Sequence, residues 1–412
     1  MKKKIGTNGI HTRKFKLTLA ILICIFALIS ISAALSEKGE KGLWVASIEK
    51  NGDSVLFADH DDSQTEGGWI QLSGGKEIQL PQPLSFSYCG TNCLERAGTT
   101  VKLNPEEPNT RPDSDKEKNT ELEFTYPYST HPFYTENQKV TMDYNGPSAF
   151  KKQEVDIYLV KGLGVGSIEE AIDLANNKTI SLEKVFSEGT NSYTKTRATL
   201  DKKGDLTKPL TFDSLEPGSY GILITLADDK DKKDKAEKEK YGMEKKVLSA
   251  TCFEVVNYEL KTDAVDTLDE GDNLDVKMCL KDAPANGEFT YGALLINKEA
   301  YKAEINVSSN GTRAGTDVFV NDIDLRDLGI NSTNYESKLS KSELSNEIQT
   351  FIGQGNGTIS IGEKKQDTLS LTTFDLLPGD YLLFTGAYEP GKGLVGIDQK
   401  ELTICTKGTS PI

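Results

Sequence analysis

The sequence predicts an all-β protein of tandem β-sandwich domains, and two observations favour this fold class. Short runs of alternating apolar and polar residues recur along the chain between turns that contain Gly, Asn or Pro, which is the pattern of half-buried strands. In addition, residues 212–220 (FDSLEPGSY) and 374–381 (FDLLPGDY) nearly repeat each other. The repeat indicates that the last two domains are duplicates of one fold.

Each repeated stretch predicts a tight corner followed by a strand. Pro fixes φ and Gly permits positive φ, so the Pro-Gly pair favours a turn. We expect the Phe and Leu side chains before the turn to point inward. In immunoglobulin-like sandwiches, a Tyr at this place hydrogen-bonds through its hydroxyl to the backbone. The last two domains are therefore expected to be immunoglobulin-like, with Tyr220 and Tyr381 as their structural corners.

A chain of 412 residues has room for about three domains. We expect an N-terminal signal peptide or anchor (1–36), a first β-sandwich (37–135), a second, immunoglobulin-like domain (136–260), a third, immunoglobulin-like domain (261–407) and a short tail (408–412). Matching strands support the duplication of the last two domains (140–144 with 276–280, 156–159 with 292–295, 253–255 with 402–404).

Two short helical inserts are expected within these domains. Residues 167–170 (SIEE) and 340–343 (SKSE) each form a capping box, the signal that opens a helix. The second box begins a stretch whose apolar residues fall on one helical face, at Leu344, Ile348 and Phe351. We therefore expect the insert of the third domain to pack on its sandwich.

The N-terminal segment predicts export. Residues 17–35 are apolar or small and uncharged, and as a helix they would span roughly 28 Å, enough to cross a bilayer. The Lys and Arg residues before them orient the rest of the chain outward. Two alternatives stay open: a cleaved signal peptide, favoured by the small residues Ser32 and Ala34, and an uncleaved anchor, favoured by the length. We expect a cell-surface or secreted protein that contacts the membrane through residues 17–35 only if they are retained.

The acidic charge of the chain argues against nucleic acid as a partner. Residues 1–34 contain six Lys and Arg and no acid, so the exported part is even more acidic than the overall net charge of −15. Such a surface repels phosphate backbones. No nucleic-acid partner is therefore expected.

The sequence predicts no catalytic residue, metal or cofactor. It contains neither a G-x-S-x-G elbow nor an H-E-x-x-H helix, and outside the N-terminal segment its only histidines are His60 and His131. The acidic stretch 266–275 (DTLDEGDNLD) leaves two interpretations: a calcium site that stiffens a domain junction, or a plain turn before a strand.

Two kinds of covalent modification are candidates. Cys89 and Cys93 are spaced to close a small disulfide loop, whereas Cys279 is expected off the apolar face of its strand. Five sequons could carry N-linked glycans. Asn177 lies in the second domain, and the other four fall in the insert region of the third domain (Asn306, Asn310, Asn331 and Asn356).

Several longer stretches, read together, resemble a known family. They are residues 69–80 (WIQLSGGKEIQL), 84–89 (LSFSYC), 291–297 (YGALLIN), 312–316 (TRAGT) and 375–383 (DLLPGDYLL). In this order they resemble the methanogen extracellular domain family, which comprises cell-surface proteins of methanogenic archaea. The resemblance covers roughly residues 43–405 and implies an archaeal envelope or secreted protein. It implies no catalytic residues.

The expected function is that of a non-enzymatic envelope protein that presents its sandwich loops to envelope proteins or surface glycans. One alternative is a carbohydrate-binding or adhesion module, which would use exposed aromatic residues between 124 and 134. A second alternative is a glycan-acting hydrolase, which would need two carboxylates facing each other about 5–10 Å apart.

Overall fold

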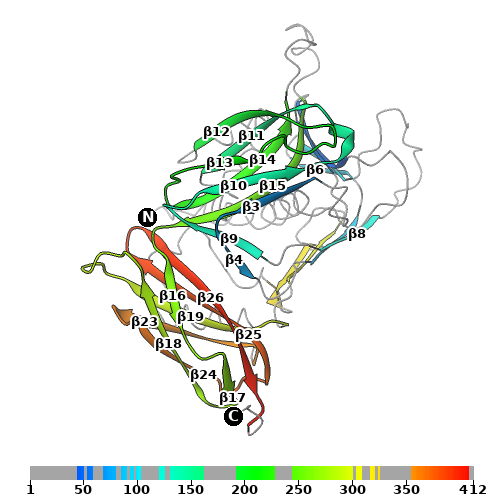
Figure 1. Ribbon diagram of the computed structural model, residues 1–412. Coiled ribbons are helices and arrows are strands. Elements are labelled where there is room, and N and C mark those ends of the chain that lie inside the picture. Colours follow the sequence, from blue (N-terminus) through cyan, green and yellow to red (C-terminus); the bar gives the residue numbers. More distant parts are fainter. Residues whose placement is uncertain are drawn as a thin grey trace, which may run out of the picture.

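The computed structural model describes residues 44–50, 53–58, 68–79, 85–90, 93–96, 99–103, 120–125, 130–161, 192–227, 244–299, 303–308, 316–320, 323–324, 353 and 355–407. Within these ranges the regular elements are β-strands and the short 3-10 helix η1 (Ser148–Phe150) (Figure 1). The all-β class and the tandem sandwiches that the sequence predicts are thus confirmed.

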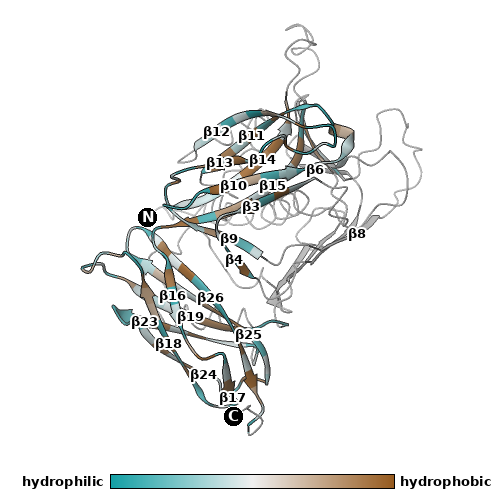
Figure 2. Ribbon diagram, viewed as in Figure 1, coloured by the Kyte–Doolittle hydropathy of each residue, from teal (hydrophilic) through white to brown (hydrophobic). Residues whose placement is uncertain are grey.

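The third domain is a sandwich of two sheets. The three-stranded sheet contains β16 (Leu260–Asp263), β18 (Asn273–Leu280) and β24 (Thr368–Thr372), and the five-stranded sheet contains β17 (Thr267–Asp269), β26 (Gly393–Cys405), β25 (Gly379–Glu389), β19 (Thr290–Asn297) and β23 (Gly357–Lys364). Every second residue of β18 is buried, at Leu274, Val276 and Met278, and these side chains pack against Leu295 and Leu383 of the facing sheet. The alternation seen in the sequence therefore forms the core (Figure 2).

The second domain repeats this plan. Its smaller sheet contains β3 (Trp69–Ser73), β10 (Val140–Asn145) and β13 (Leu210–Phe212), and its larger sheet contains β12 (Ser192–Thr199), β11 (Glu154–Lys161), β14 (Gly218–Leu226), β15 (Glu244–Val256), β9 (Thr130–Thr135) and β4 (Lys76–Gln79). Val140 and Met142 of β10 are buried, as their counterparts Val276 and Met278 on β18 are, while Tyr144 is buried and its counterpart Leu280 is half-buried. The predicted duplication therefore extends to the core positions.

Strand register supports the same equivalence. In each sandwich the corner Tyr lies opposite the last residue of one neighbouring strand and opposite a core residue of the final strand. Tyr220 lies opposite Lys161 and Phe253. Tyr381 lies opposite Asn297 and Leu402. A parallel strand then joins the end of the final strand in both sandwiches, β9 in the second domain and β17 in the third.

Both corner tyrosines make the bond that the sequence predicts. The Tyr220 hydroxyl donates to the Glu216 carbonyl at 2.7 Å, and the Tyr381 hydroxyl donates to the Leu377 carbonyl at 2.7 Å. Both rings are buried, so each bond holds a turn from inside the core. Burial also raises the pKa of Tyr220 to about 12, which keeps its hydroxyl a donor.

Replacing Tyr381 by Phe removes one buried hydrogen bond and leaves the ring in place. We expect Tyr381→Phe to lower the free energy of unfolding by about 1 kcal/mol. Chemical denaturation measures this change, with Tyr388→Phe, at a 41% exposed position of the same strand, as the matched control. An equal effect of the two substitutions would contradict the role of the corner.

The expectation that Phe and Leu before the turn point inward is wrong for part of the second corner. Phe374 is 76% exposed and Leu377 is 66% exposed, whereas Leu376 is buried. This corner is one residue shorter than the first, and β24 already ends at Thr372. Thr373 takes the inner position instead, and its hydroxyl donates to the Asp272 carbonyl at 2.6 Å.

Most of the strands that precede residue 136 belong to the second sandwich. β3 pairs with β10, β9 pairs with β15, and the hairpin of β1 (Trp44–Lys50) and β2 (Asp53–Ala58) continues the larger sheet because β2 runs parallel to β15. β7 (Thr99–Leu103) and β6 (Cys93–Arg96) extend it to ten strands. The boundary expected at residue 136 therefore does not separate two independent sheets. Local alternation identifies strands but not their partners.

The remaining strands form a sheet between two distant parts of the chain. Its order is β22 (Ile323–Asp324), β21 (Thr316–Val320), β20 (Ala303–Ser308), β5 (Ser85–Gly90) and β8 (Thr120–Thr125). β20 runs parallel to β5, with Glu304 opposite Ser85. The insert of the third domain is thus paired with a segment that the sequence assigned to the first domain.

Some expectations lie outside the described residues. These are the segment 1–36 with its apolar run 17–35, the helices expected after residues 167 and 340, and the tail 408–412. Among the residues that the structure describes, no helix reaches the length and hydropathy of a membrane span.

Candidate functional site

The second and third domains meet where the short edge strand β4 faces β26. β15 and β16 are separated by three residues of chain, and within this connection the Tyr258 N–H donates to the Val395 carbonyl at 2.9 Å. The connection is therefore tied to β26 as well. Figure 1 shows β4 and β9 beside the end of the third sandwich that carries the β16 and β26 labels.

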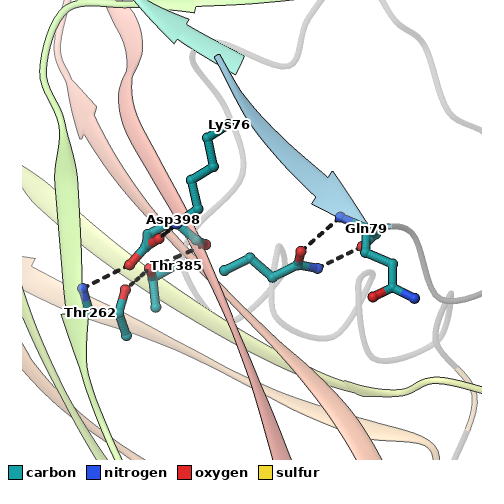
Figure 3. A network of polar contacts seen from close by, with 6 residues as sticks. Lys76, Gln79, Thr262, Thr385 and Asp398 are labelled. Carbon is teal, nitrogen blue, oxygen red and sulfur yellow. Dashed lines mark hydrogen bonds and ion pairs between the residues drawn. The ribbon is translucent and has the colours of Figure 1, made fainter. Parts of the chain in front are cut away.

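One side chain bridges the two domains by imitating a β-strand partner. The Gln79 N–H donates to Oε1 of Gln399 at 2.7 Å, and Nε2 of Gln399 donates to the Gln79 carbonyl at 2.6 Å (Figure 3). Both polar backbone groups at this position of β4 are thus satisfied by a single amide from the other domain. This arrangement fixes the end of an edge strand that would otherwise face solvent.

A charged contact lies beside this bridge. The Lys76 Nζ contacts Oδ1 of Asp398, while Oδ2 of Asp398 accepts a hydrogen bond from the Thr262 N–H at 2.8 Å (Figure 3). Asp398 is only 7% exposed and lies on the same face of β26 as the core residues Leu402 and Ile404. The third sandwich therefore has a nearly buried carboxylate where it meets the second domain, and Lys76 is its charged partner.

The surroundings change the ionisation of Lys76. Burial lowers its pKa below the ordinary lysine value, because desolvation disfavours the ammonium form. The negative charge of Glu259 raises the pKa and offsets part of this effect. Nearby, the Thr262 and Thr385 hydroxyls lie 2.6 Å apart and extend the polar network into the sandwich.

Replacing Gln399 by Ala should loosen the junction without unfolding either sandwich. The substitution removes both hydrogen bonds to β4, so we expect amide exchange at Gln79 to become at least several-fold faster, since opening of the edge is no longer opposed by bonds of about 1 kcal/mol each. Hydrogen exchange followed by mass spectrometry measures this. Exchange in the core strand β18 serves as the internal control, and equal acceleration there would indicate general destabilisation instead.

A second charged cluster lies on the outer face of the larger sheet of the second domain. Asp156 has no exposed surface; its carboxylate accepts hydrogen bonds from Nε and Nη2 of Arg197 at 2.9 and 3.2 Å, and Nζ of Lys195 lies at 2.8 Å. Burial raises the pKa of Asp156, but these bonds outweigh it and hold the pKa below the ordinary value. The pKa of Lys195 is raised because its bonds to Asp156 and Tyr158 outweigh burial. Both groups therefore stay charged, and the cluster serves stability.

A thiol and an imidazole also meet on this sheet. Cys252 Sγ lies 4.0 Å from Nδ1 of His131. Burial and the charge of Glu254 raise the pKa of Cys252 to about 11, and burial lowers the pKa of His131. At neutral pH the thiol is protonated and the imidazole neutral, so the pair lacks the thiolate that nucleophilic chemistry requires. Sequence reasoning missed this pair because β9 and β15, which are neighbours in the sheet, lie far apart in the sequence.

The disulfide candidates lie in strands of different sheets, Cys89 in β5 and Cys93 in β6. Their side chains are outside the described part, so the disulfide stays a prediction. Cys279 is exposed, as its place off the apolar face of β18 predicts.

The sequons are placed only in part. Asn306 lies in β20, and Asn356 lies just before β23, half-buried, with its carbonyl accepting from the Asn297 N–H at 2.8 Å. Asn177, Asn310 and Asn331 are outside the described residues. Glycosylation at all five stays a prediction.

The acidic stretch 266–275 forms a turn between two strands. Gly271 has φ +84°, and the Asp272 N–H donates to the Asp269 carbonyl at 3.1 Å. Asp266 forms an ion pair with Lys400 at 2.7 Å. Within the described ranges, no three Asp, Glu, His or Cys side chains converge as metal ligands would.

The aromatic residues between 124 and 134 are not presented as one surface. Tyr134 is 1% exposed and packs edge-on against Phe253 at 5.4 Å, and Phe133 packs against His131 at 5.1 Å. The side chain of Phe124 in β8 is outside the described part. Tyr134 therefore belongs to the core of the second sandwich.

Fold and junction together define a protein of paired β-sandwiches. No family model matches the chain, and no curated protein matches it. Among solved structures, the crystal structure of red sea bream transglutaminase is similar with a TM-score of 0.24 and 7% sequence identity. The match covers 67% of this chain and 30% of the transglutaminase chain, and a likeness this weak carries no conclusion about fold or activity.

Proposed function

We propose that the protein is a non-enzymatic, exported envelope protein whose joined sandwiches form a fixed spacer that presents the third domain to other envelope components. The observation that carries the proposal is the junction itself, where Gln399 and Asp398 hold β4 by direct bonds. A mobile tether needs no such contacts, because flexible connection is the default between domains. The basic, apolar N-terminal segment supports export.

The far end of the third sandwich supports presentation to a partner. Phe374 and Leu377 project from the corner before β25 and are the most exposed large apolar side chains of the described residues. Because the corner is anchored by Tyr381, these two side chains are held on a rigid support. Their chemistry suits an apolar contact with another envelope protein.

Surface proteolysis of intact cells of the native host tests the location. We expect brief trypsin treatment to release peptides of the third domain from intact cells, with a cytoplasmic enzyme of the same cells left uncut as the control. Peptides that appear only after lysis would overturn the proposal.

The contact role has its own test. The double substitution Phe374→Ser and Leu377→Ser should leave folding intact, because both side chains are exposed, and should release the protein from the washed envelope fraction. Full retention of this variant, with the wild type as reference, would show that the corner presents nothing to the envelope.

A further inference from the structure

The lysine–aspartate contact of the junction has a chemical option that an ordinary ion pair lacks. An amine and a carboxyl group held in contact can condense to an amide and release one water molecule. Fixed proximity supplies much of what such a reaction needs, since a positioned pair reacts as though at very high concentration. The reaction also needs a neutral amine, a protonated carboxyl group and a donor that holds the carbonyl oxygen.

The geometry of Asp398 meets the positional requirements. Its Oδ1 faces the Lys76 amine, whereas its Oδ2 is held by the Thr262 N–H at 2.8 Å. The two oxygens therefore have separate roles: Oδ1 is placed to leave, and Oδ2 is placed to remain as the amide carbonyl, stabilised by a backbone donor. Asp398 is 7% exposed, so little water competes for the carbonyl carbon.

A second contact between a lysine and a buried aspartate provides a comparison within the same chain. Lys195 touches the fully buried Asp156, but Arg197 also binds both oxygens of that carboxylate. This second cation keeps Asp156 ionised and leaves neither oxygen free to depart. In the described part of the chain, Lys76 is the one cation paired with Asp398.

The pKa values of the two lysines also favour Lys76 as the reacting amine. Burial lowers the pKa of Lys76, which enlarges the fraction of free amine, whereas the bonds of Lys195 raise its pKa. A neutral amine carries the lone pair that attacks a carboxyl carbon, and an ammonium group does not. Lys76 is therefore the better nucleophile of the two.

We propose that Lys76 and Asp398 form an intramolecular isopeptide bond that covalently joins β4 of the second sandwich to β26 of the third. Within the contact, the Lys76 ammonium group passes one proton to Oδ1 of Asp398, which gives a neutral amine and a protonated carboxyl group. The Nζ then attacks Cγ, the Nζ–Cγ bond forms, and the Cγ–Oδ1 bond breaks. The amine loses one proton, and the oxygen leaves as water with that proton and the one it carried.

The bond would act as a staple between domains. It requires no oxidant, reductant or cofactor, because condensation changes no oxidation state. The inference rests on the chemistry of the junction and not on the location of the protein, so it stands or falls separately from the proposed envelope role.

Peptide mapping of the full chain, after reduction and denaturation, tests the proposal directly. Trypsin cannot cut after an acylated lysine, so we expect residues 51–96 joined to residues 393–400, with a mass lower than their sum by one water. Lys76→Arg, which keeps the positive charge and remains a cleavage site, should instead give residues 51–76, 77–96 and 393–400 as separate peptides. Lys195→Arg is the matched control and should leave the joined peptide unchanged.

The opposite results are equally clear. Free peptides 51–76 and 393–400 in full yield from the wild-type protein would overturn the isopeptide bond, whether or not any variant folds, because the measurement is made on the unfolded chain.

Discussion

Phe253→Ala is expected to lower the free energy of unfolding by about 3–5 kcal/mol, because it removes a large ring from the centre of the second sandwich. Phe253 has no exposed surface. Its ring stacks on Tyr220 at 5.3 Å and meets Tyr134 edge-on at 5.4 Å. The substitution leaves a cavity between the corner tyrosine and a strand that precedes residue 136.

The matched control is Phe374→Ala, the same chemical change at a 76% exposed position of the third domain. Surface truncations of this kind usually change stability by less than about 0.5 kcal/mol. Equilibrium denaturation of the two variants measures the difference. A small effect at Phe253 would mean that β9 and β14 do not share one core, contrary to their packing.

Asp156→Asn is expected to cost about 3 kcal/mol at neutral pH, since it removes the buried charge that Lys195 and Arg197 share. The substitution keeps the shape of the side chain and removes its charge, so Arg197 and Lys195 lose their common anion. Asp213→Asn is the control, because its ion pair with Lys139, at 3.2 Å, is exposed on both sides and is worth at most about 1 kcal/mol.

The same substitution changes how stability depends on pH. The folded pKa of Asp156 lies below the unfolded value of about 3.9, so its contribution is fully present above that value and is lost as pH falls through the folded pKa. Wild-type protein should therefore lose stability more steeply than Asp156→Asn below about pH 4. Parallel slopes in acid denaturation would show that Asp156 titrates alike in both states.

Much of the fold could be predicted because its signals are local. The alternation in β10 and β18 identified the buried faces, and the repeated Pro-Gly corners identified Tyr220 and Tyr381 with their hydrogen bonds. The outward position of Phe374 could not be predicted from the repeat, because a one-residue difference in corner length placed Thr373 at the inner position instead.

The junction between the two domains could not be predicted from local sequence patterns, for a different reason. Lys76 and Asp398 are ordinary polar residues, and only the docking of β4 on β26 brings them together. One signal was present in the sequence. Asp398 is an even number of residues before Leu402 and Ile404, so it lies on the same face of the strand as these two buried residues. A buried carboxylate requires a polar or charged partner, but alternation does not say which residue supplies it.

The parallel pairing of β5 with β20 has a consequence for the order in which the chain folds. Strand β5 cannot find its partner until residues 303–308 have been synthesised, and the third sandwich surrounds these residues in sequence. Contacts between such distant segments close late, because the entropy of the intervening loop must first be overcome. A chain interrupted before residue 303 should therefore carry an unpaired edge at β5, which is a template for self-association, and completion of the last domain is what removes it.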